Sequence, residues 1–298
     1  MANLQRILLA LSLEHWQISA QHGTIGSGSI AGVKLFMLTF VKLGGSLITD
    51  KRSAEHFNAE TMRRAAHEIA QACAARPALQ VLIGHGSGSF GHVAAQKYGT
   101  AQGVSTAADW RGFGEVATVA RRLNALVADA LHEAALPIFG IQPSASALCL
   151  DGELTTLVIE PLRSALAHGL IPLVYGDVAL DEVRGGTIIS TETIFFYLAK
   201  RLQPTQIFLL GEVEGVYDAN GVVIPHITPT NFEQIADALG GSHGTDVTGG
   251  MASKVRAMLT LAQQVAGLQI RIFGGTQPGQ LQSALMDENT FGTLISDQ

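Results

Sequence analysis

Cysteine, positive charge and long apolar runs are all scarce in this 298-residue chain, and each shortage excludes a class of protein. The two cysteines, Cys73 and Cys149, lie far apart in apolar surroundings, which excludes a disulfide framework and favours reduced thiols. With 19 Lys and Arg against 25 Asp and Glu, the net charge of −6 offers nucleic acid no general attraction. No apolar run reaches the ~18 residues that span a bilayer. We therefore predict a cytoplasmic protein without a nucleic-acid or membrane partner.

Several chemical motifs are missing as well. The sequence has no G-x-x-x-x-G-K-[ST] phosphate loop, no Ser-His-Asp order and no cluster with the spacing of metal ligands. Apolar residues make up 47% of the chain, enough for the core of one large α/β domain or two small ones. Predicted strands alternate with predicted helices, which favours an α/β fold with a largely parallel sheet covered on both faces.

The first 36 residues differ from the rest of the chain. Glycine and serine dominate residues 23–32, a composition that is typical of a flexible linker. The first clean strand pattern follows at residues 38–43. We therefore predict an extension or linker over residues 1–36 and a domain over residues 37–298. A short docked helix at residues 4–16 is the alternative for the extension.

The stretch GHGSGSFGH, residues 84–92, is the centre of the sequence. It follows an apolar run that predicts a strand at residues 81–83, and an alanine-rich run predicts a helix from residue 93. A glycine loop at a helix N-terminus lets backbone N–H groups approach phosphate, and His92 adds a donor that is neutral or cationic near pH 7. The simpler alternatives are a tight turn and a structural histidine.

The glycines of this loop also match the dinucleotide fingerprint G-x-G-x-x-G, with Asp109 at about the right distance for a ribose contact. That fingerprint belongs to the first strand–helix unit of its domain, and here another such unit precedes it. A dinucleotide site is therefore disfavoured.

Two further glycine motifs carry lysines. Lys42 and Lys51 flank Gly44, Gly45 and Ser46 at the carboxyl end of the first predicted strand, where ligands bind in open α/β sheets. Lysines on both sides of a phosphate can neutralise the charge that develops in phosphoryl transfer. A turn with solvated lysines is the alternative.

The second lysine motif lies in the C-terminal half. Gly249 and Gly250 open a predicted helix there, with Lys254 one turn in. The N-terminus of a helix attracts anions, so this motif predicts a second anion site.

Two more features complete the candidate site. Asp177 follows Tyr175 and Gly176 at the end of a strong predicted strand, where its carboxylate can hold lysines apart, unless it is only a turn residue. A long helix is predicted over residues 107–135, and its first turns carry Trp110, Phe113 and Val116. These three side chains form either part of the core or the lining of an apolar pocket near His92.

Three glycine loops and three lysines favour phosphoryl transfer between two phosphate-bearing ligands. One ligand is expected at the loop of residues 86–92 and the other in the C-terminal half. The motifs V-K-L-G-G-S-L-I-T-D-K, H-G-S-G-S-F-G-H, Y-G-D and D-V-T-G-G-M-x-x-K resemble the amino acid kinase superfamily and, within it, the isopentenyl phosphate kinases. The resemblance covers roughly residues 38–298.

The resemblance implies an open αβα sandwich that is usually a homodimer. It implies ATP with Mg²⁺ as donor and a small-molecule phosphate, isopentenyl phosphate, as acceptor. The acceptor half is expected at about residues 37–177 and the nucleotide half at about residues 178–298. The mechanism needs no protein base, because the acceptor phosphate is already anionic.

The resemblance also implies residue roles. Lys42 and Lys51 are expected on the transferring phosphate and Lys254 on the ATP phosphates, with Asp177 orienting lysines and His92 holding the acceptor. The expected ATP contacts are Lys42, Gly44, Gly45, Ser46, Ser87, Gly211, Glu212, Tyr217, Gly249, Gly250 and Lys254. The expected substrate contacts are Gly86, Gly88, Gly91, His92, Trp110, Phe113, Val116 and Gly176.

The sequence departs from the family pattern at three places. Ser87 stands where a third glycine is common, Ser-Thr-Glu-Thr at residues 190–193 replaces Ser-Gly-Asp-Asp, and Gly-Glu-Val-Glu-Gly at 211–215 replaces Thr-Asp-Val-Asp-Gly. The last two lie in the nucleotide half and bear on donor preference and metal contacts. Two alternatives stay open: a kinase of the same fold for another phosphate or phosphonate of the fosfomycin type, and a non-catalytic nucleotide-binding regulator.

Overall fold

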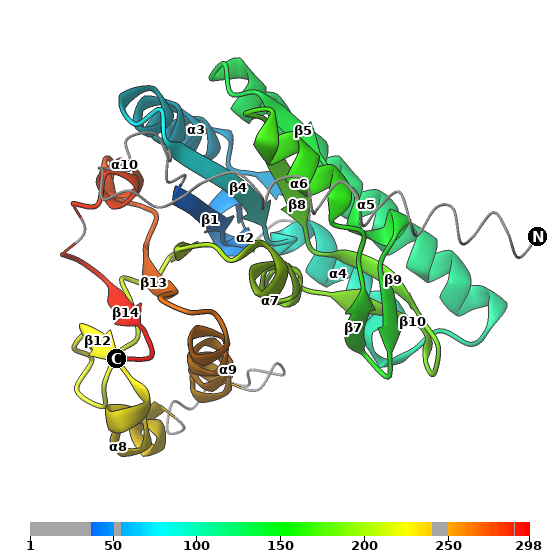
Figure 1. The fold of residues 1–298 in the computed structure, drawn as a ribbon. Coiled ribbons are helices and arrows are strands. Elements are labelled where there is room, and N and C mark those ends of the chain that lie inside the picture. Colours follow the sequence, from blue (N-terminus) through cyan, green and yellow to red (C-terminus); the bar gives the residue numbers. More distant parts are fainter. Residues whose placement is uncertain (1–36, 51–54, 240–249, 289) are drawn as a thin grey trace, which may run out of the picture. The chain divides into compact units, whose positions relative to one another are not determined.

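An eight-stranded sheet forms the middle layer of the chain in the computed structural model (Figure 1). The structure describes residues 37–50, 55–239, 250–288 and 290–298, so the predictions for residues 1–36, Lys51 and Gly249 lie outside the described residues. The strand order is β12-β14-β13-β11-β1-β4-β8-β5, and within the described residues every neighbouring pair is parallel except β13 and β14. The strands are β1 (Met37–Leu43), β4 (Leu79–His85), β5 (Ile138–Gly140), β8 (Ile171–Tyr175), β11 (Gln206–Gly211), β12 (His226–Ile227), β13 (Gln269–Gly274) and β14 (Thr293–Ile295).

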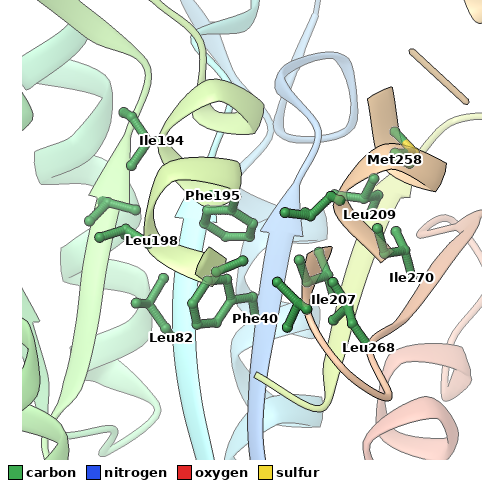
Figure 2. Packing of buried hydrophobic residues seen from close by; sticks show 14 of the residues in the cluster. Phe40, Leu82, Ile194, Phe195, Leu198, Ile207, Leu209, Met258, Leu268 and Ile270 are labelled. Carbon is green, nitrogen blue, oxygen red and sulfur yellow. The ribbon is translucent and has the colours of Figure 1, made fainter. Parts of the chain in front are cut away.

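Helices cover both faces of this sheet, which confirms the predicted αβα arrangement. Side chains alternate along each strand, so Phe40 of β1 points into one core cluster while Val41 points into the other. The first cluster packs against α6 (Glu160–Ala167), α7 (Thr191–Leu202) and α9 (Gly250–Gln264), and Figure 2 shows Phe195 of α7 against Phe40. The second packs against α3 (Ala59–Ala75), α5 (Ala107–Glu133) and α10 (Gln280–Leu285). The remaining helices are α2 (Gly45–Ile48), α4 (Gly88–Tyr98) and α8 (Pro229–Leu239).

A second, four-stranded sheet has the order β10-β9-β6-β7. An Asp151-Gly152 turn joins β6 (Leu148–Leu150) to β7 (Glu153–Thr156) as a hairpin, and both turn residues have positive φ. Antiparallel pairing joins β9 (Asp177–Asp181) to β10 (Gly185–Ile189). A short two-stranded ladder of β2 (Thr49–Asp50) and β3 (His56–Phe57) follows α2.

Local capping signals explain where the helices begin. The Asn58 side chain accepts a hydrogen bond from Thr61 N at the start of α3, and Asn is among the residues preferred at this position. Thr106 and Asp109 form a capping box at the start of α5. The Asp109 carboxylate is therefore engaged at a helix end, which removes the acidic partner that a dinucleotide site requires.

A buried carboxylate ties α10 to α3, and we predict a large loss of stability when it is removed. The side chain of Glu68 accepts hydrogen bonds from the backbone N–H groups of Gly279, Leu281 and Gln282 at 2.9, 3.0 and 3.2 Å. Glu68→Ala leaves one buried and two half-buried donors without this partner and is expected to lower the free energy of unfolding by about 2–3 kcal/mol. Urea denaturation measures the change.

The matched control is Gln71→Ala, because Gln71 is exposed on the same helix. This substitution is expected to change the free energy of unfolding by less than about 0.5 kcal/mol. An equally small change for Glu68→Ala would show that the carboxylate does not stabilise α10.

Candidate active site

Glycines follow the carboxyl ends of five neighbouring strands, β13, β11, β1, β4 and β8. For four of these strands, the backbone N–H of the glycine bonds to the end of the adjacent strand: Gly44 N to Leu210 O at 2.8 Å, Gly86 N to Leu43 O at 3.0 Å, Gly176 N to His85 O at 3.3 Å and Gly275 N to Gly211 O at 2.8 Å. The fifth strand, β11, itself ends in Gly211. The hydrogen bonding between neighbouring strands therefore continues past their carboxyl ends into a row of turns along one edge of the sheet. In open α/β sheets this is the edge where ligands bind.

The first two glycine loops touch each other through their backbones. A Cβ atom on Gly45 would lie 2.3 Å from Gly88 N, and one on Gly86 would lie 2.8 Å from Gly45 N. Gly88 has φ +48°, and a Cβ there would lie 2.0 Å from the hydroxyl of Thr49. Only glycine permits this approach, so the two motifs that lie far apart in sequence form one surface.

Lys42 is held at this edge by a carboxylate. Its Nζ lies 2.8 Å from Oε1 of Glu192, and its side chain is only 12% exposed. Burial raises the pKa of Glu192, but Lys42, its hydrogen bond and the more distant Lys254 outweigh that effect and lower the pKa below its ordinary value. The ionised carboxylate therefore fixes the ammonium group of Lys42.

The start of α7 places Glu192 beside Lys42. The Ser190 side chain caps the helix by accepting from Thr193 N at 3.0 Å. Thr191 Oγ1 donates to His85 O at 2.6 Å, which fastens the first turn of α7 to the end of β4. The carboxylate of Glu192 is thus positioned by bonds on both sides of it.

The structure gives the contact with Lys42 to Glu192, whereas the sequence suggested Asp177 for the orienting role. Asp177 is 1% exposed and accepts from Ser144 N at 3.1 Å and Val178 N at 2.9 Å. Burial raises its pKa against these hydrogen bonds. Sequence reasoning missed Glu192 because it lies in a segment that departs from the family pattern. The available signal was an acid two residues after a serine N-cap.

His92 lies inside a helix and does not close a loop. The helix α4 begins at Gly88 rather than at residue 93, so the glycines of the motif lie in its first turn. His92 is exposed, and its Nδ1 lies 2.7 Å from Gly88 O. A carbonyl only accepts, so Nδ1 carries the proton and Nε2 is the nitrogen left for a ligand. His168 makes the same contact with Ser164 O on α6, so the contact alone does not mark a site.

The apolar residues at the start of α5 separate into two environments. Val116 is buried in the second core cluster, as the simpler interpretation of this stripe expects. The rings of Trp110 and Phe113 lie 5.4 Å apart, and Trp110 is 41% exposed. A Cβ on Gly186 of β10 would lie 2.8 Å from the ring of Phe113, so this glycine makes room for the aromatic side chain. Of the three predicted pocket residues at the start of this helix, the aromatic pair therefore provides the accessible apolar surface.

The expected nucleotide contacts from the C-terminal half of the chain lie on other elements. Gly211 ends β11, Glu212 is exposed, and the hydroxyl of Tyr217 accepts from Glu214 N at 3.3 Å. Lys254 lies in the first turns of α9, and its charge lowers the pKa of Glu192. The carboxylate of Glu192 thus interacts electrostatically with one lysine from each half of the chain, Lys42 and Lys254.

Some features lie away from these residues or are missing from the described part of the chain. Among the described residues, no group of three or more His, Cys, Asp or Glu side chains is placed to hold a metal ion. In the same residues, no helix is long and apolar enough to cross a membrane. A hollow of about 470 Å³ between the β6–β7 hairpin and α7 contains none of the predicted site residues. Its lining is Gly152, Glu153, Leu154, Thr193, Phe196, Tyr197, Lys200 and Arg201.

Comparisons with known proteins agree with this geometry. The sequence profile of the amino acid kinase family matches residues 37–274. The chain is 34% identical over 269 residues to an isopentenyl phosphate kinase of Methanothermobacter thermautotrophicus, covering 87% of this chain and 99% of that protein. It is 40% identical over 261 residues to one of Haloferax volcanii, covering 87% and 98%. An X-ray structure of an isopentenyl phosphate kinase superposes with a TM-score of 0.73 at 30% identity, covering 87% of this chain and 100% of that one.

Proposed function

The chain belongs to the amino acid kinase family, and we propose that it is an ATP-dependent kinase that converts isopentenyl phosphate to isopentenyl diphosphate. One observation carries the proposal. The Gly44–Gly45 and Gly86–Gly88 loops touch at the edge of the sheet where Glu192 holds Lys42. Backbone N–H groups and a fixed cation at one point suit a phosphoryl group that passes between two anionic ligands.

The reaction forms one bond and breaks one. An oxygen of the acceptor phosphate attacks the γ-phosphorus of ATP, and the bond from that phosphorus to the β-phosphate oxygen breaks to release ADP. The attacking oxygen is already anionic, so no side chain has to remove a proton. The protein contributes alignment and charge stabilisation, with Lys42 on the transferring phosphate and His92 Nε2 on the acceptor.

Further roles follow from the resemblance stated above. We assign Lys51 to the transferring phosphate and Lys254 with Gly249 and Gly250 to the ATP phosphates. Mg²⁺ commonly binds through substrate phosphates with few protein ligands, which fits the described part of the chain, where no three His, Cys, Asp or Glu side chains gather. Bound there, it would neutralise phosphate charge. A homodimer and a cytoplasmic location stay predictions.

An ADP-release assay with Mg-ATP tests the proposed function. The panel holds isopentenyl, dimethylallyl, geranyl and farnesyl phosphates together with fosfomycin. Efficient turnover of the short prenyl phosphates is expected, because the aromatic pair Trp110 and Phe113 offers an apolar surface. Turnover of fosfomycin alone would show that the acceptor is a phosphonate and not a prenyl phosphate. No turnover with ATP still bound would favour the regulator hypothesis.

A pair of variants decides which carboxylate orients Lys42. Glu192→Gln replaces a charged contact at 2.8 Å and is expected to lower kcat by about tenfold. Asp177→Asn is expected to leave kcat within about threefold, because Asp177 bonds to Ser144 and Val178 instead. Since the pKa of Glu192 lies below its ordinary value, the carboxylate stays ionised near neutral pH and adds no titration there. Steady-state kinetics with both substrates saturating measure both effects. A larger loss for Asp177→Asn would return the orienting role to Asp177.

A further inference from the structure

His85 is the last residue of β4 and lies directly beneath the glycine loop. It is 1% exposed, and its ring stacks on Tyr175 of β8 with 5.6 Å between centroids and 8° between planes. The stacking follows from the register, in which His85 is paired with Tyr175. In the register of β1 with β4, His85 is paired with Leu43 and Lys42 is paired with Gly84. Since successive side chains of a strand point to opposite faces, the side chain of Lys42 leaves the sheet on the face opposite to His85.

Both ring nitrogens of His85 have a partner. Nδ1 lies 3.1 Å from Gly86 O, and Nε2 lies 3.1 Å from Oδ1 of Asn124 on α5. Burial lowers the pKa of His85, and the charge of Lys42 lowers it further, against these two hydrogen bonds. A pKa below its ordinary value favours the neutral ring, which carries one proton, at neutral pH.

The position of that proton follows from the partners. Gly86 O can only accept, so Nδ1 must be the donor. Nε2 of the neutral ring must then accept, so the carboxamide of Asn124 is turned by 180° and presents its NH₂ group instead of Oδ1 to Nε2. Asn124 thus selects the tautomer in which Nδ1–H faces the loop.

The hydrogen bond fixes the peptide unit between Gly86 and Ser87. This peptide is trans, as are all described peptide bonds, so the carbonyl of Gly86 and the N–H of Ser87 point in opposite directions. Holding the carbonyl down toward the buried ring turns Ser87 N–H away from it. Among the described residues, Ser87 N donates to no protein acceptor, so this N–H is left for a ligand.

We propose that His85 is a positioning residue of the acceptor-phosphate site, which it serves by holding the Gly86 carbonyl so that Ser87 N–H faces the phosphate. The proposal rests on the function proposed above. His85 touches no ligand itself. Without its Nδ1–H, the peptide unit is free to turn and to present a carbonyl oxygen, which repels phosphate.

Two substitutions at this position separate positioning from packing. In His85→Asn, the side-chain amide places a donor at the position of Nδ1. In His85→Gln, the longer side chain places its amide at the position of Nε2 instead. Both variants lose the stacking on Tyr175. His85→Gln is expected to raise the KM for isopentenyl phosphate by about tenfold, with the KM for ATP within about twofold. His85→Asn is expected to keep the acceptor KM within about threefold of the wild type. Thermal melting of both variants reports the packing that they lose in common.

A second measurement distinguishes a failure of the positioning role of His85 from a failure of the proposed kinase function. Binding of inorganic phosphate is followed by ³¹P NMR with the nucleotide site filled by a non-hydrolysable ATP analogue. Weaker binding in His85→Gln but not in His85→Asn supports the positioning role, even if the wild type does not turn over isopentenyl phosphate. Equal losses in both variants, in step with equal drops in melting temperature, would overturn it while wild-type turnover still upholds the function.

Discussion

A Lys42→Met variant is expected to fold and to bind both substrates, but to lose about 10³-fold in kcat. Lys42 is the cation that Glu192 fixes at the junction of the two glycine loops, and it is largely shielded from water. Charge on the transferring phosphate is greatest in the transition state, so a fixed ammonium group there acts mainly on kcat. Met preserves the length of the aliphatic side chain and removes only the charge. Steady-state ADP release with both substrates saturating measures the effect.

The control for this prediction is Lys97→Met. Lys97 also pairs with a glutamate, Glu115 at 3.5 Å, but on the exposed face of α4. It is expected to keep kcat within about twofold, because exposed ion pairs contribute little. If Lys42→Met keeps more than about a tenth of the wild-type kcat, Lys42 does not stabilise the transferring phosphate. A double variant, Lys42→Met with Glu192→Gln, removes the unpaired carboxylate as a cause of any loss.

Most of the fold is predictable because its signals are local. The β4 strand, the α3 helix capped by Asn58 and the Asp151-Gly152 hairpin all follow from patterns within a few residues. The glycine motifs are equally visible, since a close backbone approach leaves a direct trace in the sequence.

The pairing inside the candidate site was not predictable in the same way. Lys42 and Glu192 lie on different elements, and only the packing of α7 across β1 and β4 brings them together. The sequence pattern predicts the beginning of α4 at residue 93, which is too late, because the glycines that suggest a loop lie in the first turn of the helix. A sequence pattern gives the residue types at the edge of the sheet, but the register of neighbouring strands determines which of them meet.

The register of the strands also places the side chains of the site on the two opposite faces of the sheet. Lys42 leaves the sheet toward α7, where Glu192 holds it, and His85 leaves toward α5, where Asn124 holds it. The glycine loops lie between these layers at the edge of the sheet. A charge and an oriented backbone therefore reach the same edge of the sheet from opposite faces.

His92→Ala is expected to lower kcat/KM for isopentenyl phosphate by about 10²-fold while leaving the KM for ATP nearly unchanged. The carbonyl of Gly88 occupies Nδ1 at 2.7 Å, so Nε2 is the nitrogen that can donate to the acceptor phosphate when the ring is cationic. Alanine removes this donor and keeps a residue that helices favour. Initial rates over a range of both substrates separate the two KM values.

Two further variants isolate the role of Nε2. His168→Ala removes the same contact from an exposed helix position outside the candidate site, and it is expected to change neither KM. His92→Gln places an amide donor near the position of Nε2 and is expected to recover about tenfold of the lost kcat/KM. If His92→Ala raises both KM values equally, or His92→Gln recovers nothing, then His92 acts on α4 rather than on the acceptor. A loss confined to the acceptor, with partial recovery by Gln, would establish the acceptor phosphate at the N-terminus of α4, beside the peptide unit that His85 orients.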